Sequence, residues 1–279
     1  MIREAVIPAA GYGTRVSPAS RAVPKELFPI PIRIGYRKLY LVPALQIILQ
    51  QLYEAGIDSF YIIVNHYKKT IIEGYLRPDY NYLYTLIGNG KLGEASLLNK
   101  FYGILDRIRI SYIIQERPLG VGDAIYRSRD HVEGQFMIHM GDDLIISSHN
   151  EYLRMIKEHT RLGSDATILV QMVDNPRQYG VVEGDEEDNY IWVNKIIEKP
   201  DVDTPKYAII GVYCIKPVIF EVMESLSRRG EWELTDAVQE MVDQGYKVVA
   251  IKASPGAARI DIGRPETYLE VFRKPIQLW

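Results

Sequence analysis

The chain alternates apolar runs of strand length with segments of helical period. Apolar side chains between residues 44 and 52 recur at i, i+1, i+4, i+5 and i+8, which is one face of an amphipathic helix. The runs with strand length are residues 5–8, 60–64, 108–114, 136–140 and 166–173, and two further helical segments are 122–131 and 151–162. This alternation predicts an α/β fold, with a Rossmann-like, mainly parallel (mixed) sheet flanked by helices.

The second half of the chain predicts an accessory β layer on that sheet. Residues 179–183 and 191–198 flank the acidic turn 184–189, which is typical of a hairpin. The same pattern predicts strands at 208–215 and 247–251, and helices at 218–226 and 234–243. Residues 78–102 follow neither period well and are interpreted as an insertion. Without a linker or an internal repeat, residues 1–279 are predicted to form a single domain.

Composition narrows the class of protein. The 279 residues carry a formal net charge of −3, with 47% hydrophobic and 25% charged residues, as in a soluble globular protein. That balance argues against a nucleic-acid partner and against a membrane-surface protein. The single Cys214 lies in an apolar run and is interpreted as a small buried side chain. We expect no membrane association and a cytoplasmic protein, because no signal peptide or long apolar segment is evident.

The segment after the first predicted strand contains a candidate phosphate-binding loop. Glycines at a strand-to-helix turn let main-chain N–H groups approach a phosphate, and Arg15 adds a forked cation. The loop is not a Walker loop, and Val16 occupies the third glycine position of the dinucleotide fingerprint. Lys25, between Pro24 and an apolar anchor, is predicted to be held in a defined loop. The alternatives are a simple tight turn and a solvated surface lysine.

Together these two segments resemble a known family. Gly11-x-Gly13-Thr14-Arg15 and Pro18-Ala19-Ser20-Arg21-Ala22-Val23-Pro24-Lys25-Glu26 are similar to the motif of bacterial-type UTP–glucose-1-phosphate uridylyltransferases, within the wider sugar-nucleotidyltransferases. The resemblance implies an enzyme that joins UTP to glucose 1-phosphate with Mg²⁺ and releases pyrophosphate. It implies catalytic roles for Arg15 and Lys25. The nucleotide-binding residues that it implies are Ala10, Gly11, Gly13, Thr14, Gln115 and Gly120.

The resemblance also places a metal site and a base-reading site. It implies that Gln115 reads the pyrimidine edge and that Gly120 lets the base lie against the backbone. Asp142, at the end of a predicted strand, and Asp261 are the implied Mg²⁺ ligands, and magnesium prefers such carboxylates with phosphate oxygens. Asp143 is interpreted as a turn residue or as a support for its neighbour. On spacing alone, an aspartate before a glycine is more often a turn residue.

The sugar phosphate is assigned to the second half of the chain. By resemblance, Gly180, Glu198 and Gly211 hold or surround the sugar, and Lys199 contacts its phosphate. Without the resemblance, Glu198 and Lys199 would be interpreted as an exposed charge pair at a strand end. The nucleotide part is therefore expected at about residues 1–145 and the sugar-phosphate part at about 146–279.

Some alternatives stay open at this level. Residues 31–39 depart from the Asp-Lys-Pro usual in relatives, which leaves the local loop and the subunit contacts uncertain. Gln115 does not distinguish uracil from thymine, so dTTP and other sugar 1-phosphates remain candidate substrates. A non-catalytic sugar-nucleotide sensor is a second class, and a nicotinamide-dependent dehydrogenase is a third. The family resemblance implies a homo-oligomer, either a dimer or a tetramer.

Overall fold

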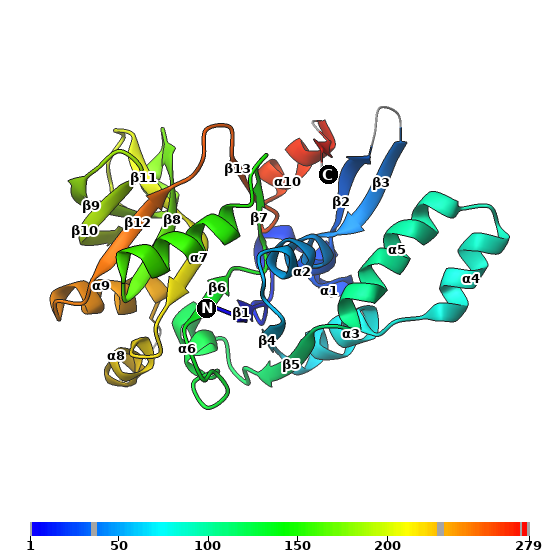
Figure 1. The fold of residues 1–279 in the computed structure, drawn as a ribbon, viewed down its shortest axis with the longest axis horizontal. Coiled ribbons are helices and arrows are strands. Elements are labelled where there is room, and N and C mark those ends of the chain that lie inside the picture. Colours follow the sequence, from blue (N-terminus) through cyan, green and yellow to red (C-terminus); the bar gives the residue numbers. More distant parts are fainter. Residues whose placement is uncertain (1, 35–37, 228–231, 274, 278–279) are drawn as a thin grey trace.

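The computed structural model describes residues 2–34, 38–227, 232–273 and 275–277. Within these residues a nine-stranded mixed sheet runs through the molecule in the order β5-β4-β1-β6-β11-β8-β12-β10-β9 (Figure 1). Its strands are β1 (Glu4–Pro8), β4 (Ser59–Val64), β5 (Arg109–Ile114), β6 (Phe136–His139), β8 (Ala166–Val173), β9 (Gly180–Glu186), β10 (Tyr190–Glu198), β11 (Lys206–Ile215) and β12 (Val248–Lys252).

The two halves of the sheet differ in strand direction. β5, β4, β1 and β6 are all parallel, as expected for βαβ units. β11 runs antiparallel to both β6 and β8, and the predicted hairpin is formed by β9 and β10. The fold class is therefore confirmed as a mixed sheet. The first half of the chain supplies one block of four parallel strands, and β8 and β12 form a further parallel pair among antiparallel neighbours.

Helices cover both faces of this sheet. They are α1 (Ala19–Ala22), α2 (Ala44–Glu54), α3 (His66–Leu76), α4 (Tyr80–Gly88), α5 (Leu92–Leu105), α6 (Gly120–Tyr126), α7 (Glu151–Leu162), α8 (Ile219–Leu226), α9 (Leu234–Asp243) and α10 (Pro265–Arg273). Alternate residues of β1 enter opposite cores, with Ala5 and Ile7 in one and Val6 in the other. The first core is formed with α2, α3, α5 and α7, and the second with α6, α8 and α9.

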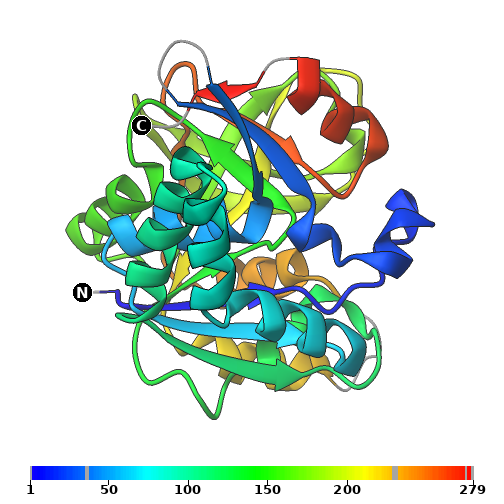
Figure 2. The ribbon, with the colours of Figure 1, turned by 90° about the vertical axis from the view of Figure 1, so that its right-hand side faces the viewer.

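Residues 78–102 are helical. Asp79 begins α4 by accepting a hydrogen bond from the Tyr82 amide at 3.0 Å, and α5 follows after a short turn. The α4–α5 pair, coloured teal, lies at one end of the molecule in Figure 1 and faces the viewer in Figure 2. The expected helix at 122–131 is shorter than predicted, because α6 ends at Tyr126. None of the described helices is long and apolar enough to cross a membrane.

Two small sheets were not predicted from the sequence. β2 (Pro29–Ile34) and β3 (Lys38–Pro43) form a hairpin that β14 (Ile276–Gln277) joins, and residues 35–37 of the divergent segment lie outside the described part. β7 (Asp143–Ile146) pairs antiparallel with β13 (Ala258–Asp261), so that Asp261 lies opposite Asp143. This second pairing brings Asp143 and Asp261, which are more than 100 residues apart in the sequence, side by side.

Candidate active site

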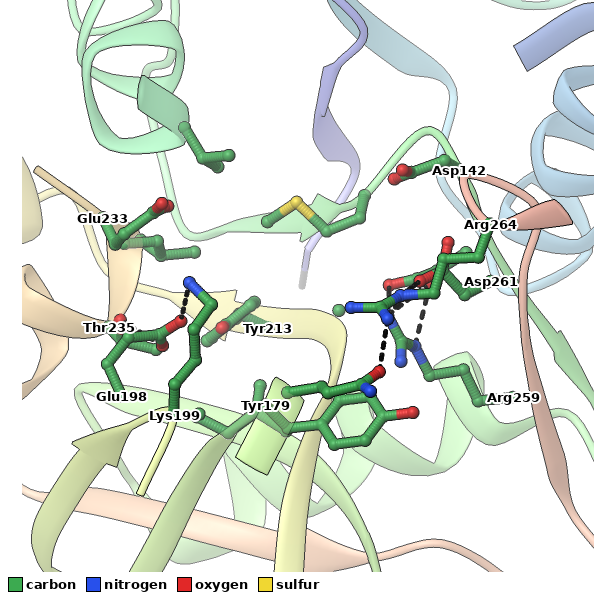
Figure 3. Close-up of a pocket in the computed structure, with 18 of the residues that line it drawn as sticks. Asp142, Tyr179, Glu198, Lys199, Tyr213, Glu233, Thr235, Arg259, Asp261 and Arg264 are labelled. Atoms are coloured by element: carbon green, nitrogen blue, oxygen red, sulfur yellow. Dashed lines mark hydrogen bonds and ion pairs between the residues drawn. The ribbon is translucent and has the colours of Figure 1, made fainter. Parts of the chain in front are cut away.

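A cleft that is open to solvent lies between the two halves of the sheet. The predicted site residues that line it are Arg15, Asp142, Gly180, Glu198, Lys199, Gly211 and Asp261. Figure 3 shows Glu198, Lys199 and Thr235 on one side of the cleft, with Asp142, Asp261, Arg259 and Arg264 on the other. The structure therefore gathers residues that are more than 200 positions apart in the sequence.

The amino-terminal loop follows β1 directly and contains the predicted Ala10, Gly11, Gly13 and Thr14. Gly13 has φ +66°, and its carbonyl accepts a hydrogen bond from Ser20 Oγ at 2.8 Å. A Cβ atom at Gly13 would lie 3.0 Å from that of Ser20, so both the backbone angle and the space favour glycine. Gly11 and Thr14 are exposed, which leaves this loop open to a ligand.

Lys25 lies against the metal-ligand candidates, although it does not line the cleft itself. It begins the short 3₁₀ turn Lys25–Leu27, and its ammonium forms an ion pair with Asp142. Burial lowers the pKa of Lys25, but the charges of Asp142, Glu26 and Asp261 and the hydrogen bond to Asp142 together outweigh it, so the pKa lies above its ordinary value. The side chain is therefore a partly buried, permanent cation rather than a solvated surface lysine.

The two predicted metal ligands are close together. Asp142 follows β6, and Asp261 is the last residue of β13, where its Oδ1 accepts from the Gly263 amide at 2.8 Å. A Cβ atom at Gly263 would lie 2.7 Å from Asp142 Oδ2, 3.0 Å from Asp261 Oδ1 and 3.3 Å from Lys25 Nζ. The missing side chain of Gly263 thus leaves space between both carboxylates and the lysine.

Asp143 and Arg259 form an ion pair in the same wall of the cleft, and its importance was not evident from the sequence. Arg259 Nε and Nη2 donate to Asp143 Oδ1 and Oδ2 at 2.8 and 3.0 Å. Asp143 begins β7 and is buried, so the interpretation as a turn residue is wrong and that of a supporting residue remains. Burial, only partly offset by Arg259, and the neighbouring Asp142 and Asp261 charges raise the pKa of Asp143 to about 7.

Arg264 is the second arginine that sequence reasoning missed. Its Nε donates to Asp261 Oδ2 at 3.1 Å, and its guanidinium also donates to Gln178. Arg259 is two residues before the predicted ligand Asp261 and Arg264 is three residues after it, but the sequence pattern assigned neither of them a role. A motif search aimed at glycines and carboxylates passes over them, because β7–β13 pairing and the turn after Asp261 are what bring them to the cleft.

Three of the predicted sugar-phosphate residues, Gly180, Glu198 and Lys199, cluster opposite the Asp142–Asp261 pair, whereas Gly211 lies against Asp143. Glu198 ends β10, where Thr235 Oγ1 donates to its Oε2 at 3.0 Å and Lys199 Nζ lies 2.8 Å from its Oε1. A Cβ atom at Gly180 would lie 3.0 Å from Glu198 Oε2, so this glycine leaves room beside the carboxylate. Gly211 has φ +75°, and a Cβ atom there would overlap the Asp143 carboxylate.

Gln115 and Gly120 lie at the edge of this arrangement. Neither lines the cleft, but Val121, next to Gly120, does. Gln115 follows β5 and is 5% exposed, and its Nε2 donates to the Gly120 carbonyl at 3.1 Å. Before α9, Glu231 lies outside the described residues. Thr235 contacts Glu198, and Asp236 accepts a hydrogen bond from the Glu233 amide in the cap of α9.

A mixed α/β sheet carrying a glycine loop, a lysine and paired aspartates across from a polar clamp is the architecture of a nucleotidyltransferase. Residues 4–277 match the family described as Nucleotidyl transferase, and the chain belongs to that family. It is therefore a nucleotidyltransferase-family enzyme with the Rossmann-like fold of that family.

Named relatives narrow the comparison further. The chain is 31% identical over 248 residues to UTP–glucose-1-phosphate uridylyltransferase 1 of Staphylococcus saprophyticus, which covers 86% of this chain and 82% of the relative. It is 30% identical over 275 residues to UTP–glucose-1-phosphate uridylyltransferase of Streptococcus pneumoniae, covering 94% and 86%. A UDP-glucose pyrophosphorylase structure complexed with UDP-glucose superposes with a TM-score of 0.82 at 25% identity, covering 98% of both chains.

Proposed function

We propose that this chain transfers the uridylyl group of UTP to glucose 1-phosphate, giving UDP-glucose and pyrophosphate. The observation that carries the proposal is the arrangement of the cleft. The Glu198–Lys199 clamp lies on one side of it, and the Asp142–Asp261 pair lies on the other. In this proposal the Glu198 carboxylate accepts hydrogen bonds from the sugar hydroxyls, and Lys199 beside it binds the sugar phosphate. The two aspartates across the cleft bind the Mg²⁺ of the nucleotide. The named activities of the relatives support the same assignment.

The obstacle in this reaction is electrostatic. A phosphate oxygen of glucose 1-phosphate attacks the α-phosphorus of UTP, the bond to the β-phosphate oxygen breaks, and pyrophosphate leaves. The nucleophile is already an anion, so no general base is required, and the protein must position two anions and neutralise charge. We assign Arg15 and the glycine loop to the triphosphate, Lys25 to the reacting and leaving phosphates, and Lys199 to the incoming phosphate.

Asp142 and Asp261 suit a magnesium ion. Mg²⁺ is bound by one or two carboxylates together with substrate phosphates, and the gap at Gly263 leaves space between these two carboxylates. A bound Mg²⁺ would supply positive charge to the triphosphate and hold its oxygens in a fixed arrangement. Burial raises the pKa of Asp142, but Lys25 offsets this and keeps the pKa below its ordinary value, so the carboxylate is ready as an anionic ligand.

Pyrophosphate release tests the proposed function. UTP, dTTP, CTP, ATP and GTP are each assayed with glucose 1-phosphate and Mg²⁺, and release is expected to be greatest with UTP and absent with EDTA. Dominant turnover of dTTP would replace the proposal with a thymidylyl enzyme. If no pyrophosphate is released with any of these nucleotides, across several sugar phosphates and metals, a non-catalytic sensor would be favoured. The predicted homo-oligomer is tested separately by light scattering.

Alanine at position 263 is expected to damage the site without damaging the fold. Gly263 does not have a positive φ, so only the added methyl group acts, and it would press on both carboxylates and Lys25. Because misplacing a catalytic group by about 1 Å costs on the order of 100-fold, we expect Gly263→Ala to lower kcat/KM by roughly that factor. Gly103→Ala in α5 is the matched control, since its Cβ would meet nothing within 4 Å. Full activity of Gly263→Ala would contradict the metal assignment.

A further inference from the structure

The carboxamide of Gln115 is held in one orientation by its neighbours. Its Nε2 donates to the Gly120 carbonyl at 3.1 Å and to Asp123 Oδ2 at 2.7 Å. Its backbone N–H donates to the Val64 carbonyl at 2.9 Å, so the main chain is fixed as well. A carbonyl and a carboxylate only accept hydrogen bonds, so the –NH₂ group, and not the oxygen, must face them.

Asp123 is itself held in place. Arg127 Nε lies 2.9 Å from Asp123 Oδ2, and Arg127 Nη2 lies 3.2 Å from Oδ1, one turn further along the chain. The turn of α6 that carries Asp123 packs closely on the segment before α9, because a Cβ atom at Gly122 would overlap the ring of Trp232. The acceptor that orients Gln115 therefore lies on a rigid support.

Both hydrogens of the Gln115 carboxamide are used inside the protein. Of the residues that the structure describes, none donates a hydrogen bond to Gln115 Oε1. The side chain therefore offers a ligand an acceptor only. A ligand edge that meets this oxygen must supply a donor.

We propose that Asp123 is a positioning residue that sets base selectivity by fixing the Gln115 oxygen toward the base. This proposal rests on the proposed function and on the base-reading role that the family resemblance implies for Gln115. Uracil and thymine each have a single ring donor, N3–H, which suits an acceptor at Oε1. Cytosine has a lone pair at N3, so the same contact would be a repulsion between two acceptors.

Accepting cytosine would require the carboxamide to rotate. Rotation would turn Oε1 toward the Asp123 carboxylate and the Gly120 carbonyl, which replaces two hydrogen bonds with two contacts between acceptors. Leaving a buried polar group unpaired costs about 1–3 kcal/mol in proteins, which corresponds to roughly fivefold to 150-fold in selectivity. Asp123 thereby increases the preference for uracil over cytosine that Gln115 sets, although Asp123 itself does not contact the nucleotide.

The ordinary explanation of Asp123 is a helix-stabilising ion pair with Arg127. Such i,i+4 pairs are common and contribute little. Under that explanation, changing Asp123 would affect all nucleotides in the same proportion. A change in the ratio between two nucleotides is therefore the measurement that separates the two roles.

The test compares kcat/KM for UTP and CTP in the wild type and three variants, with glucose 1-phosphate as co-substrate. Asp123→Asn keeps the shape of the side chain, but its –NH₂ group can donate to Gln115 Oε1. The Gln115 carboxamide is then free to rotate. Asp123→Leu removes the acceptor altogether. Glu116→Gln is the matched control, because it neutralises an exposed carboxylate next to Gln115 that pairs only with His66 among the described residues. Thermal unfolding of each variant shows whether it folds.

We expect the wild type to prefer UTP strongly, and both Asp123 variants to narrow the preference by roughly tenfold. In Asp123→Asn, the kcat/KM for CTP should rise above the wild-type value, which a loss of structure cannot produce. Glu116→Gln should keep the wild-type ratio. If Asp123→Leu does not fold, Asp123→Asn alone decides.

Two results would overturn the proposal. One is a wild type that uses UTP and CTP equally well, and the other is a proportional loss with both nucleotides in Asp123→Asn. If no nucleotide is turned over, the proposed function fails but this inference is still testable. Calorimetric binding of UDP and CDP to the same proteins then measures the preference directly, and equal affinities in the wild type would reject it.

Discussion

Replacing Lys25 by alanine is expected to lower kcat for UDP-glucose synthesis by roughly 100-fold to 1,000-fold, with a much smaller effect on glucose 1-phosphate binding. Removing one preorganised group that stabilises charge in a transition state typically has an effect of this size. Lys25 is a permanent cation paired with Asp142, and Asp142 lines the wall of the cleft opposite the Glu198–Lys199 clamp. Its charge therefore acts on the reacting phosphates rather than on the sugar.

Steady-state kinetics and direct binding of glucose 1-phosphate measure the two effects separately. Lys69→Ala is the control, because Lys69 is a half-buried lysine on α3 that pairs with Glu73 across one helical turn. It should leave both constants unchanged. Equal losses of turnover and of glucose 1-phosphate affinity in Lys25→Ala would assign this lysine to ground-state binding instead.

Elements with a strong hydrophobic period were predictable from the sequence. The strands β1, β4 and β8 and the helix α2 combine apolar side chains with clear boundaries, and the structure has them at nearly the expected residues. The helices α4 and α5 were not evident, because their exposed faces also carry large apolar residues such as Tyr84 and Leu92. A helix is recognised in a sequence by apolar residues on one face and polar residues on the other. When both faces carry apolar residues, that 3.6-residue period is no longer visible.

The candidate site was predictable where it follows local motifs, and not where it depends on tertiary pairing. Gly13 and Lys25 lie in a continuous segment, so their proximity could be inferred from the chain alone. Asp143 and Arg259 face each other only because β7 pairs with β13. Nothing in two four-residue strands, separated by more than 100 residues, indicates that pairing in advance.

The buried ion pair between Lys68 and Glu26, beneath the glycine loop, is expected to contribute strongly to the free energy of unfolding. Lys68 Nζ donates to Glu26 Oε1 and Oε2 at 2.9 and 2.8 Å and to the Ala9 carbonyl at 2.9 Å. Both side chains are almost completely buried, at 2% and 1% exposure. The pair thus joins the start of the glycine loop to the residue after Lys25, and it holds both segments of the candidate site together.

Lys68→Met is expected to lower the free energy of unfolding at pH 8 by about 3–5 kcal/mol, since it leaves a buried carboxylate without its partner. Chemical denaturation measures this loss. The double variant Lys68→Met/Glu26→Gln should recover much of it, because a neutral carboxamide avoids the unpaired charge. Wild-type stability of Lys68→Met at pH 8 would show that Glu26 does not depend on Lys68.

The pH dependence of Lys68→Met gives an independent test of the same pair. Burial raises the pKa of Glu26 and Lys68 lowers it, so removing Lys68 should move the pKa further above its ordinary value. The folded state then binds a proton more tightly than the unfolded state, and stability must fall as pH rises above about 4.3, the ordinary pKa of glutamate. Lys68→Met should therefore be more stable at pH 5 than at pH 8, relative to the double variant. The double variant cannot show this dependence, because it lacks the titrating carboxyl. If the stabilities of the two variants changed with pH in parallel, the loss in Lys68→Met would be due to lost packing and not to the unpaired carboxylate.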